Sequence, residues 1–172
     1  MEFYDAINQR FSVRKFKPDP VEPEKLQRLW EAVRMAPSAC NFQPWRFLSV
    51  KSPAAREQLG EVLRLPGFSP QDWSLQAPEF IVALGNRDTA WRRDNESVLA
   101  IDVAIALEHL VLAAAAEGLG TCWICAFNRK ALFRALGLAS PWEPVACTPL
   151  GYPDEPWRRT DRKPLGEILK EI

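Results

Sequence analysis

Residues 98–116, VLAIDVAIALEHLVLAAAA, form the stretch that decides the fold of this chain. Almost every side chain in it is apolar, so a helix built from it is hydrophobic nearly all round and belongs inside a protein or a membrane. The stretch also carries Asp102, Glu108 and His109, and ionisable groups are costly in lipid. We therefore predict a long central helix that ends at Gly118 and is buried in protein, with no membrane span.

Short apolar runs and amphipathic stretches alternate on both sides of this helix. Residues 45–50 alternate large apolar and other side chains, which is typical of a strand, and residues 80–84 form a continuous apolar run that indicates a buried strand. Alternating strands and helices predict an α/β or α+β fold with helices on both faces of a sheet. The full prediction has strands at 45–50, 80–84, 121–125 and 144–150, a polar loop at 86–96, and helices at 3–10, 22–36, 53–63, 98–117, 128–136 and from 164 onward.

Composition sets limits on the class of protein. The chain has 172 residues, with 22 Lys and Arg against 22 Asp and Glu, and four Cys. This length predicts a single domain over residues 1–172. The net charge of zero argues against nucleic-acid binding, which normally needs a basic protein. The first residues show no basic region followed by an apolar run, so we expect no secretory signal, a cytoplasmic location and reduced cysteines.

Two basic clusters lie near opposite ends of the chain, one made of Arg10, Arg14, Lys15 and Lys17, the other of Arg158, Arg159, Arg162 and Lys163. In an extended segment, Arg10, Ser12 and Arg14 would face the same way. Two guanidiniums beside a hydroxyl suit a phosphorylated ligand, because arginine offers planar, permanently charged donors. A solvated charged face is the alternative interpretation of both clusters.

Residues 37–45, PSACNFQPW, place Ser, Asn and Gln side chains between two prolines, where a predicted helix joins a predicted strand. A rigid loop with such side chains can hydrogen-bond the edge of a planar ring system. The alternative is a turn whose polar side chains bond only to their own backbone.

Residues 118–123, GLGTCW, contain two glycines before a predicted strand. Gly118 ends the long helix, and Gly120 allows a close backbone approach. The spacing matches neither a dinucleotide-binding fingerprint nor a P-loop. Cys122 and Cys125 match C-x-x-C, but cysteines three apart on a strand point to opposite faces, so we predict packed thiols and no metal site. The single histidine, His109, is expected to be packed and hydrogen-bonded. With no second histidine and no G-x-S-x-G motif, a Ser-His-Asp hydrolase has little support.

Taken together, these segments resemble the nitroreductase family of flavin enzymes. The matching pieces occur in the family's order over nearly the whole chain, at residues 10–14, 37–47, 102–109, 118–123, 150–153 and 162–165. The resemblance implies an α+β fold with a central, mostly antiparallel sheet flanked by helices around a long buried helix. It also implies a homodimer with one FMN in each of two sites at the subunit interface.

The resemblance assigns roles by position. Arg10 and Ser12 would hold the FMN phosphate, and Arg162 and Lys163 would complete that site, so that the two basic clusters converge. Arg14 would approach the N1/O2 end of the flavin ring. Phe11 would lie beside Arg10. The partner subunit's loop, with Pro37, Ser38, Ala39 and Asn41, would reach the ring or ribityl chain, and Gln43 would support that loop. Along the opposite edge of the ring would lie Thr121, Cys122 and Trp123, with a backbone N–H near N5.

The implied activity is that of an FMN-dependent NAD(P)H oxidoreductase, which reduces nitroaromatics, quinones or similar electron-poor acceptors by ping-pong hydride transfer. The flavin carries out the hydride chemistry, so no catalytic acid or base is required. Two alternatives stay open: a non-catalytic flavin or phospho-ligand binding protein, and a thiol-redox or zinc protein that uses Cys122 and Cys125. Unlike many family members, this chain is expected to have no long helical insertion between Val50 and Glu79 and no extended C-terminal arm.

Overall fold

The computed structural model describes residues 1–65 and 71–172. At its centre lies an antiparallel sheet of four strands in the order β1-β2-β6-β5. The strands are β1 (Trp45–Val50), β2 (Glu79–Asn86), β6 (Trp142–Gly151) and the short edge strand β5 (Gly120–Thr121).

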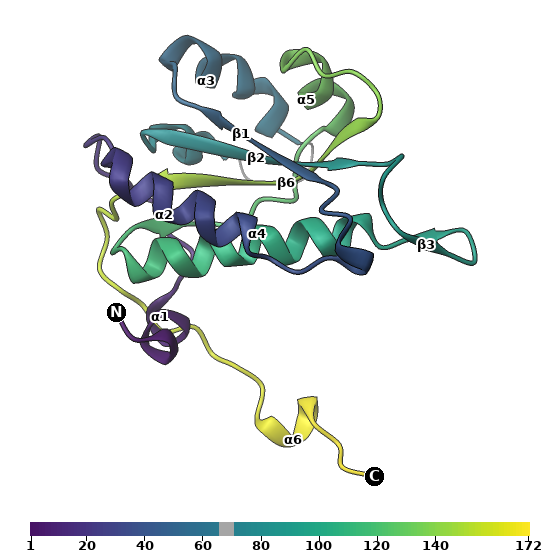
Figure 1. Ribbon diagram of the computed structural model, residues 1–172. Coiled ribbons are helices and arrows are strands. Elements are labelled where there is room, and N and C mark those ends of the chain that lie inside the picture. Colours follow the sequence, from purple (N-terminus) through teal and green to yellow (C-terminus); the bar gives the residue numbers. More distant parts are fainter. Residues whose placement is uncertain (66–70) are drawn as a thin grey trace.

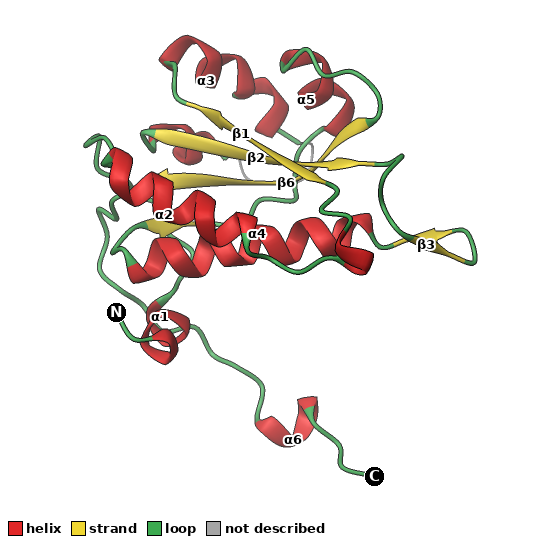
Figure 2. Cartoon of the chain, in the orientation of Figure 1, coloured by secondary structure: helices red, strands yellow, loops and turns green. Residues whose placement is uncertain are grey.

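Helices cover both faces of this sheet (Figures 1 and 2). On one face lie α2 (Pro23–Arg34) and α4 (Leu99–Ala116), with α1 (Phe3–Gln9) beyond α4. On the other face lie α3 (Pro53–Leu59) and α5 (Arg129–Ala135). The predicted class, α+β with a mostly antiparallel sheet flanked by helices and a long central helix, is confirmed.

Strand β2 is buried on both faces, which explains its continuous apolar run. Ile81 and Ala83 pack in a hydrophobic cluster with residues of α2 and α4. Phe80, Val82 and Leu84 pack in a second cluster with residues of α3 and α5. Because side chains alternate along a strand, both faces must be apolar when both are covered. The core therefore has two halves, separated by the sheet.

Helix α4 is buried along one face only. Asp102 and seven apolar side chains of the helix are buried, whereas Ile101 is 60% exposed and Ile105 and Leu112 are partly exposed on the same face. By length and composition α4 could cross a membrane, but 44% of it is buried inside the fold. Because α4 is apolar on all sides, the side that does not pack in the fold exposes apolar side chains to solvent in the single chain.

Three predicted elements differ from the structure. The helix expected at 53–63 ends at Leu59 and is followed by a separate 3-10 segment, Glu61–Leu63. The strand expected at 121–125 is shorter, because β5 ends at Thr121 and the chain returns to the sheet only through a bridge between Ile124 and Cys147. The polar loop expected at 86–96 contains a small hairpin, with β3 (Arg92–Arg93) paired to β4 (Glu96–Ser97). The turn of the hairpin is made by Asp94 and Asn95 at φ 50° and 69°, a conformation that Asp and Asn tolerate well.

The C-terminal segment is an extended arm, so the expectation that the chain lacks one is wrong. Every residue after Glu155 is exposed, and α6 (Leu165–Ile168) lies away from the body of the molecule (Figure 1). Leu165 and Ile168 are 67% and 69% exposed. A helix this short is not stable without packing, so the arm needs a surface to lie on.

Between β1 and β2 the described residues contain α3 and two 3-10 segments, Glu61–Leu63 and Asp72–Gln76. This fits the expectation that no long helical insertion lies there, apart from residues 66–70, which fall outside the described part of the chain.

Candidate functional site

The segment that follows α1 runs alongside β5. Ser12 forms a parallel bridge with Thr121, and the Val13 N–H donates to the Thr121 carbonyl at 2.9 Å. Gly120 makes this approach possible, because a Cβ at that position would lie 2.7 Å from a Val13 methyl group. Val13 is buried and Phe11 packs against the same small cluster. Two of the predicted site segments, 10–14 and 118–123, therefore lie side by side.

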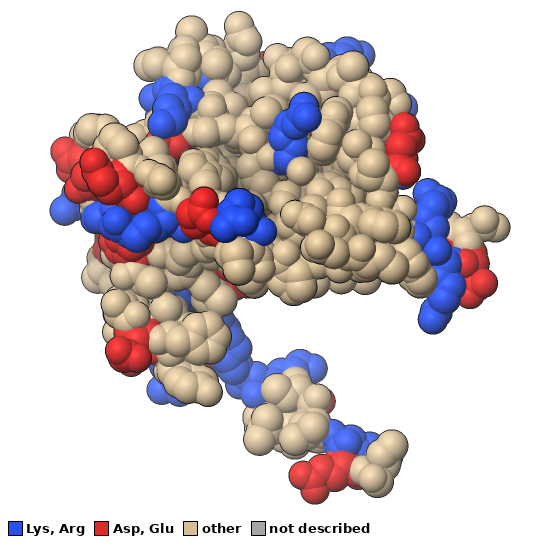
Figure 3. All heavy atoms as spheres, viewed as in Figure 1, with Lys and Arg blue, Asp and Glu red and all other residues tan. Residues whose placement is uncertain are grey.

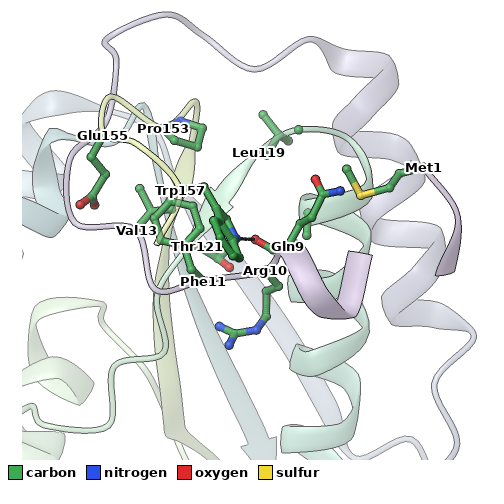
Figure 4. Close-up of a pocket in the computed structure, with 12 residues that line it drawn as sticks. Met1, Gln9, Arg10, Phe11, Val13, Leu119, Thr121, Pro153, Glu155 and Trp157 are labelled. Carbon is green, nitrogen blue, oxygen red and sulfur yellow. Dashed lines mark hydrogen bonds between the residues drawn. The ribbon is translucent and has the colours of Figure 1, made fainter. Parts of the chain in front are cut away.

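The start of the C-terminal arm is hydrogen-bonded to the same segment. The indole Nε1 of Trp157 donates to the Gln9 carbonyl at 2.9 Å (Figure 4). The Arg158 guanidinium donates to the Ser12 carbonyl at 3.0 Å. These contacts join the two ends of the sequence and bring the second basic cluster next to the first.

The two basic clusters meet at a cavity of about 450 Å³. Arg10 reaches it from the N-terminal cluster, and Arg158, Arg159 and Arg162 reach it from the arm. In Figure 3, Lys and Arg side chains gather where the arm leaves the body. None of the described residues that line this cavity is acidic; the others are Ile7, Asn8, Trp157 and Thr160. Guanidiniums that converge in this way form a site suited to a phosphate group. One of them, that of Arg158, also lies 3.8 Å from a carboxylate oxygen of Glu155, which is outside the cavity lining.

Of the residues predicted to hold the phosphate or to approach N1 of the ring, Ser12 does not line this cavity, and Lys163 and Arg14 also lie outside it. The Lys163 ammonium is 3.6 Å from a Glu167 carboxylate oxygen. The Arg14 guanidinium lies 5.9 Å from the centre of the Trp73 ring, and the Arg14 backbone N–H donates to the Glu155 carboxylate. The roles assigned to these three residues stay predictions.

A second cavity, of about 490 Å³, adjoins the first and shares Arg10 and Trp157 with it. It lies between α1, the end of α4 and the start of the arm (Figure 4). Phe11, Thr121 and Leu119 are among its lining residues. A largely apolar recess next to a cationic one is the arrangement that a phosphorylated ring compound requires.

Cys122 and Trp123 follow β5 directly. The Cys122 N–H donates to Thr148 Oγ1 at 3.0 Å, so it is already paired. The Trp123 indole donates to Glu108 at 2.8 Å, while the Trp123 backbone N–H has no acceptor among the described residues. Of these two backbone groups, only that of Trp123 is free to bond a ligand.

The prediction of packed thiols is confirmed for Cys122 and wrong for Cys125. Cys122 is buried, Cys125 is exposed, and both are free thiols. Burial raises the pKa of the Cys122 thiol above its usual range, although the nearby Arg14 charge and a hydrogen bond with Ser12 act in the opposite direction. A buried, protonated thiol is a weak nucleophile. The described residues also contain no group of three potential metal ligands.

The loop at residues 37–44 bonds mainly to itself. Ser38 Oγ accepts from the Gln43 N–H at 2.8 Å, and the Gln43 side-chain amide donates to the Asn41 carbonyl and side chain at 3.0 and 3.2 Å. Cys40, Asn41 and Gln43 have φ of 50°, 57° and 49°. For residues other than glycine this conformation costs about 1 kcal/mol or more each, and it is found most often at functional sites.

Asp102 ties this loop to α4. Its side chain is 2% exposed, its Oδ1 accepts from the Ala39 N–H at 3.0 Å, and its Oδ2 has no partner among the described residues. The contact lies in the first turn of α4, whereas the bridge between Ser12 and Thr121 lies beyond the last turn. An 18-residue helix is about 27 Å long. The two groups of predicted ligand residues therefore lie at opposite ends of α4 and do not meet within one chain.

Sequence reasoning missed two residues that organise the site. Glu155 accepts backbone hydrogen bonds from Arg14 and Lys15, and Trp157 lies between the two cavities. Their only signal is their place in the sequence, directly before the second basic cluster.

Comparison with known proteins agrees with this geometry. A model of the Nitroreductase family matches residues 7–67 and 65–152. The 5,6-dimethylbenzimidazole synthase of Rhodobacter capsulatus is 31% identical, and the alignment covers 94% of this chain and 86% of that protein. An NADH dehydrogenase of Thermus thermophilus is 29% identical and the alignment covers 95% of this chain and 93% of that protein. The crystal structure of a nitroreductase family protein from Clostridium novyi NT is 35% identical, with a TM-score of 0.84 over 90% of this chain and 87% of that one. This chain belongs to the nitroreductase family of oxidoreductases.

Proposed function

We propose that the protein is a homodimeric, FMN-dependent NAD(P)H oxidoreductase that reduces nitroaromatics, quinones or similar electron-poor acceptors. The observation that carries the proposal is the convergence of Arg10, Arg158, Arg159 and Arg162 on one cavity. A phosphate monoester carries nearly two negative charges at neutral pH, and several guanidiniums match it. The residues present thus fit the phosphate end of an FMN.

The groups next to the basic cavity suit the ring of an FMN. Arg14 lies close enough to Cys122 for its charge to affect the thiol, so a positive charge stands beside the segment after β5. Such a charge favours the electron-rich, reduced form of a flavin ring, and the unpaired N–H of Trp123 can donate a hydrogen bond to it. When bound, FMN supplies the hydride transfer from NAD(P)H to the acceptor, so the protein contributes binding, orientation and electrostatics.

A second subunit would complete the site. Because the loop at 37–44 lies at the far end of α4, it would cover the ring that the other subunit holds, with Ser38, Ala39 and Asn41 facing that ring. The open face of α4, with Ile101, and the exposed apolar side chains of α6 supply surface for the partner. A two-fold symmetric dimer would then contain two equal sites.

The visible spectrum of the purified protein tests this proposal. We expect two flavin absorption bands, which anaerobic NADH or NADPH bleaches and which p-benzoquinone or a nitroaromatic restores. A protein that stays colourless after reconstitution with FMN contradicts the proposal. A flavin band that neither NADH nor NADPH bleaches would instead indicate a non-catalytic flavin-binding protein.

The products of the reaction separate this activity from that of a relative. The Rhodobacter capsulatus protein is a 5,6-dimethylbenzimidazole synthase, so the reaction mixture with FMN and NAD(P)H should also be analysed for 5,6-dimethylbenzimidazole. Reduced acceptor without this compound supports the proposed acceptor class. Accumulation of 5,6-dimethylbenzimidazole in place of reduced acceptor would contradict it.

A further inference from the structure

A third cavity, of about 540 Å³, lies beside α5, at the end of the sheet where β2 ends and β6 begins. It shares no lining residue with the two cavities at the other site. Its apolar lining consists of Phe133, Trp142 and Pro144, which are half-buried or buried. Its charged lining consists of the exposed cations Arg87, Arg129, Lys130 and Arg134 and of a single acid, Glu143.

Most of the cations at this cavity lack a partner. Arg87 pairs with Glu143 at 3.5 Å. Within the described part of the chain, no carboxylate lies within ion-pairing distance of Arg129, Lys130 or Arg134. In a chain whose net charge is zero, three unpaired cations around one cavity create a local positive field that attracts anions.

The local secondary structure does not account for these charges. Arg129 and Lys130 are the first two residues of α5, and Asn128 caps the helix through its side chain. The start of a helix favours acidic side chains, so the helix itself gives no reason for two cations at these positions. A bound anion would compensate for both cations at once.

One of the two aromatic side chains of the cavity, that of Trp142, is held by a neighbouring cation. The Arg46 guanidinium of β1 lies 4.2 Å from the centre of the Trp142 ring, which fixes the indole and adds a further positive charge. Trp142 and Phe133 together present aromatic surface on which a planar ring can stack. The volume lies within the range typical of small-molecule sites, about 300–1,000 Å³.

We propose that this cavity binds a free nucleotide, a planar aromatic ring joined to two or more phosphates. The ring would stack on Trp142 and Phe133, and the phosphates would pair with Arg129, Lys130 and Arg134. The apolar part of the cavity would bind the ring of the nucleotide, and the cationic part would bind its phosphates. The proposal stands independently of the flavin site.

Isothermal titration calorimetry of the FMN-loaded protein tests it, with ADP, adenosine and pyrophosphate as probes. We expect ADP to bind more tightly than either fragment by about tenfold, because only ADP uses both halves of the cavity. The Arg129→Ala/Arg134→Ala variant should weaken ADP binding at least about tenfold, the scale of one charge-assisted hydrogen bond. Trp142→Leu should weaken binding of ADP but leave that of pyrophosphate unchanged.

One control variant shows whether the binding is local. Arg92→Ala/Arg93→Ala removes the same charge from the exposed β3–β4 hairpin, and ADP affinity should stay unchanged in it. If the protein does not bind FMN, the wild type, this hairpin control and the Arg129→Ala/Arg134→Ala variant are compared in the flavin-free state. Failure of the two proposals can then be told apart, because only binding at the third cavity depends on Arg129 and Arg134.

Three results would overturn the proposal. The first is an ADP affinity that the Arg129→Ala/Arg134→Ala variant does not change, and the second is an equal loss in the hairpin control. The third is tight binding of single-stranded RNA without measurable binding of ADP. Because both substituted arginines are exposed, these variants are expected to fold even if Trp142→Leu does not, as thermal unfolding will show.

Discussion

The two ends of α4 are built in different ways. At its C-terminal end, the segment after α1, strand β5 and the C-terminal arm are joined by hydrogen bonds such as those from Val13 to Thr121 and from Arg158 to Ser12. This end is cationic. At its N-terminal end, the loop at 37–44 is uncharged, bonds mainly to itself, and is attached to the helix through Asp102.

Under the proposed function, the difference matches two separate tasks. Holding a doubly charged phosphate needs several fixed cations, and these come from segments that are distant in sequence. Presenting small polar groups to the edge of a ring needs a fixed backbone shape, which is stored as strained φ angles. The two ends are separated by most of the length of α4, so they can serve one ligand only if two chains are combined.

The largest effect is expected at the cationic end. Arg10→Ala/Arg158→Ala should weaken FMN binding by about 3 kcal/mol or more, and Arg10→Ala alone by about 2 kcal/mol or more, because each charge-assisted contact contributes about 1.5–3 kcal/mol. Quenching of FMN fluorescence measures both. Lys170→Ala, on the same arm, is the matched control and should leave FMN affinity unchanged. An equal loss of affinity in this control would mean that the overall positive charge of the arm, and not the arginines at the cavity, binds FMN.

A close backbone contact supports the same end. In Gly120→Ala the new Cβ would meet the Val13 side chain at 2.7 Å, and such overpacking lowers the free energy of unfolding by about 1–3 kcal/mol. Urea unfolding measures the change, and FMN affinity should fall with it. Gly166→Ala has no atom within 4 Å of the new Cβ and should leave both quantities unchanged. Unchanged stability in Gly120→Ala would show that the two segments are not held together as described.

The buried thiols should lower the free energy of unfolding at alkaline pH. Burial raises the pKa of Cys147 and Cys122, so the folded chain keeps protons that the unfolded chain releases above a pH of about 8.5. The contribution of these thiols to the free energy of unfolding should therefore be constant below that pH and fall above it, by at most about 1.4 kcal/mol per pH unit for each thiol. Urea unfolding between pH 7 and 10 measures the slope. Cys147→Ala should reduce the slope, and a slope equal to that of the wild type would contradict the assignment.

The smallest effect is expected at the strained end. Asp102→Ala removes the carboxylate that accepts from the Ala39 N–H, and losing one hydrogen bond should weaken FMN binding by about 1 kcal/mol. Asp102→Asn retains an acceptor and should keep most of the affinity. Fluorescence titration compares the two variants. If Asp102→Ala lost as much FMN affinity as Arg10→Ala, the proposed difference between the two ends of α4 would be contradicted.

Much of the fold could be predicted from the sequence, because local patterns specify it. The apolar run of β2, the length of α4 and the side-chain caps at Ser52 and Asn128 are all local signals. The hairpin at 92–97 was missed because its strands are short and polar. The extended arm was missed because its apolar side chains have nothing to pack on within the chain.

The candidate site was predictable only in part. Alternation in residues 10–14 indicated a phosphate-binding face, and the family resemblance added the other segments. That Arg158 and Trp157 contact Ser12 and Gln9 is a matter of tertiary structure, which spacing does not encode. The separation of the two ligand groups by α4 likewise emerges only from the fold.

Subunit complementation tests most directly whether one site is shared by two chains. One variant carries Arg10→Ala/Arg158→Ala, the other carries Asn41→Ala/Asp102→Ala, and both are assayed at an FMN concentration near the wild-type dissociation constant. In the second variant the loss of one hydrogen bond from each side chain adds up to about 2 kcal/mol of FMN affinity, so at this concentration each variant alone should have lost most of its NAD(P)H oxidoreductase activity. Co-expression should restore about a quarter of the wild-type activity, because half of the dimers are mixed and each of these regains one intact site in a two-fold symmetric arrangement. If both groups of residues acted within one chain, every site would stay defective, and the mixture would show no more activity than the two variants measured separately.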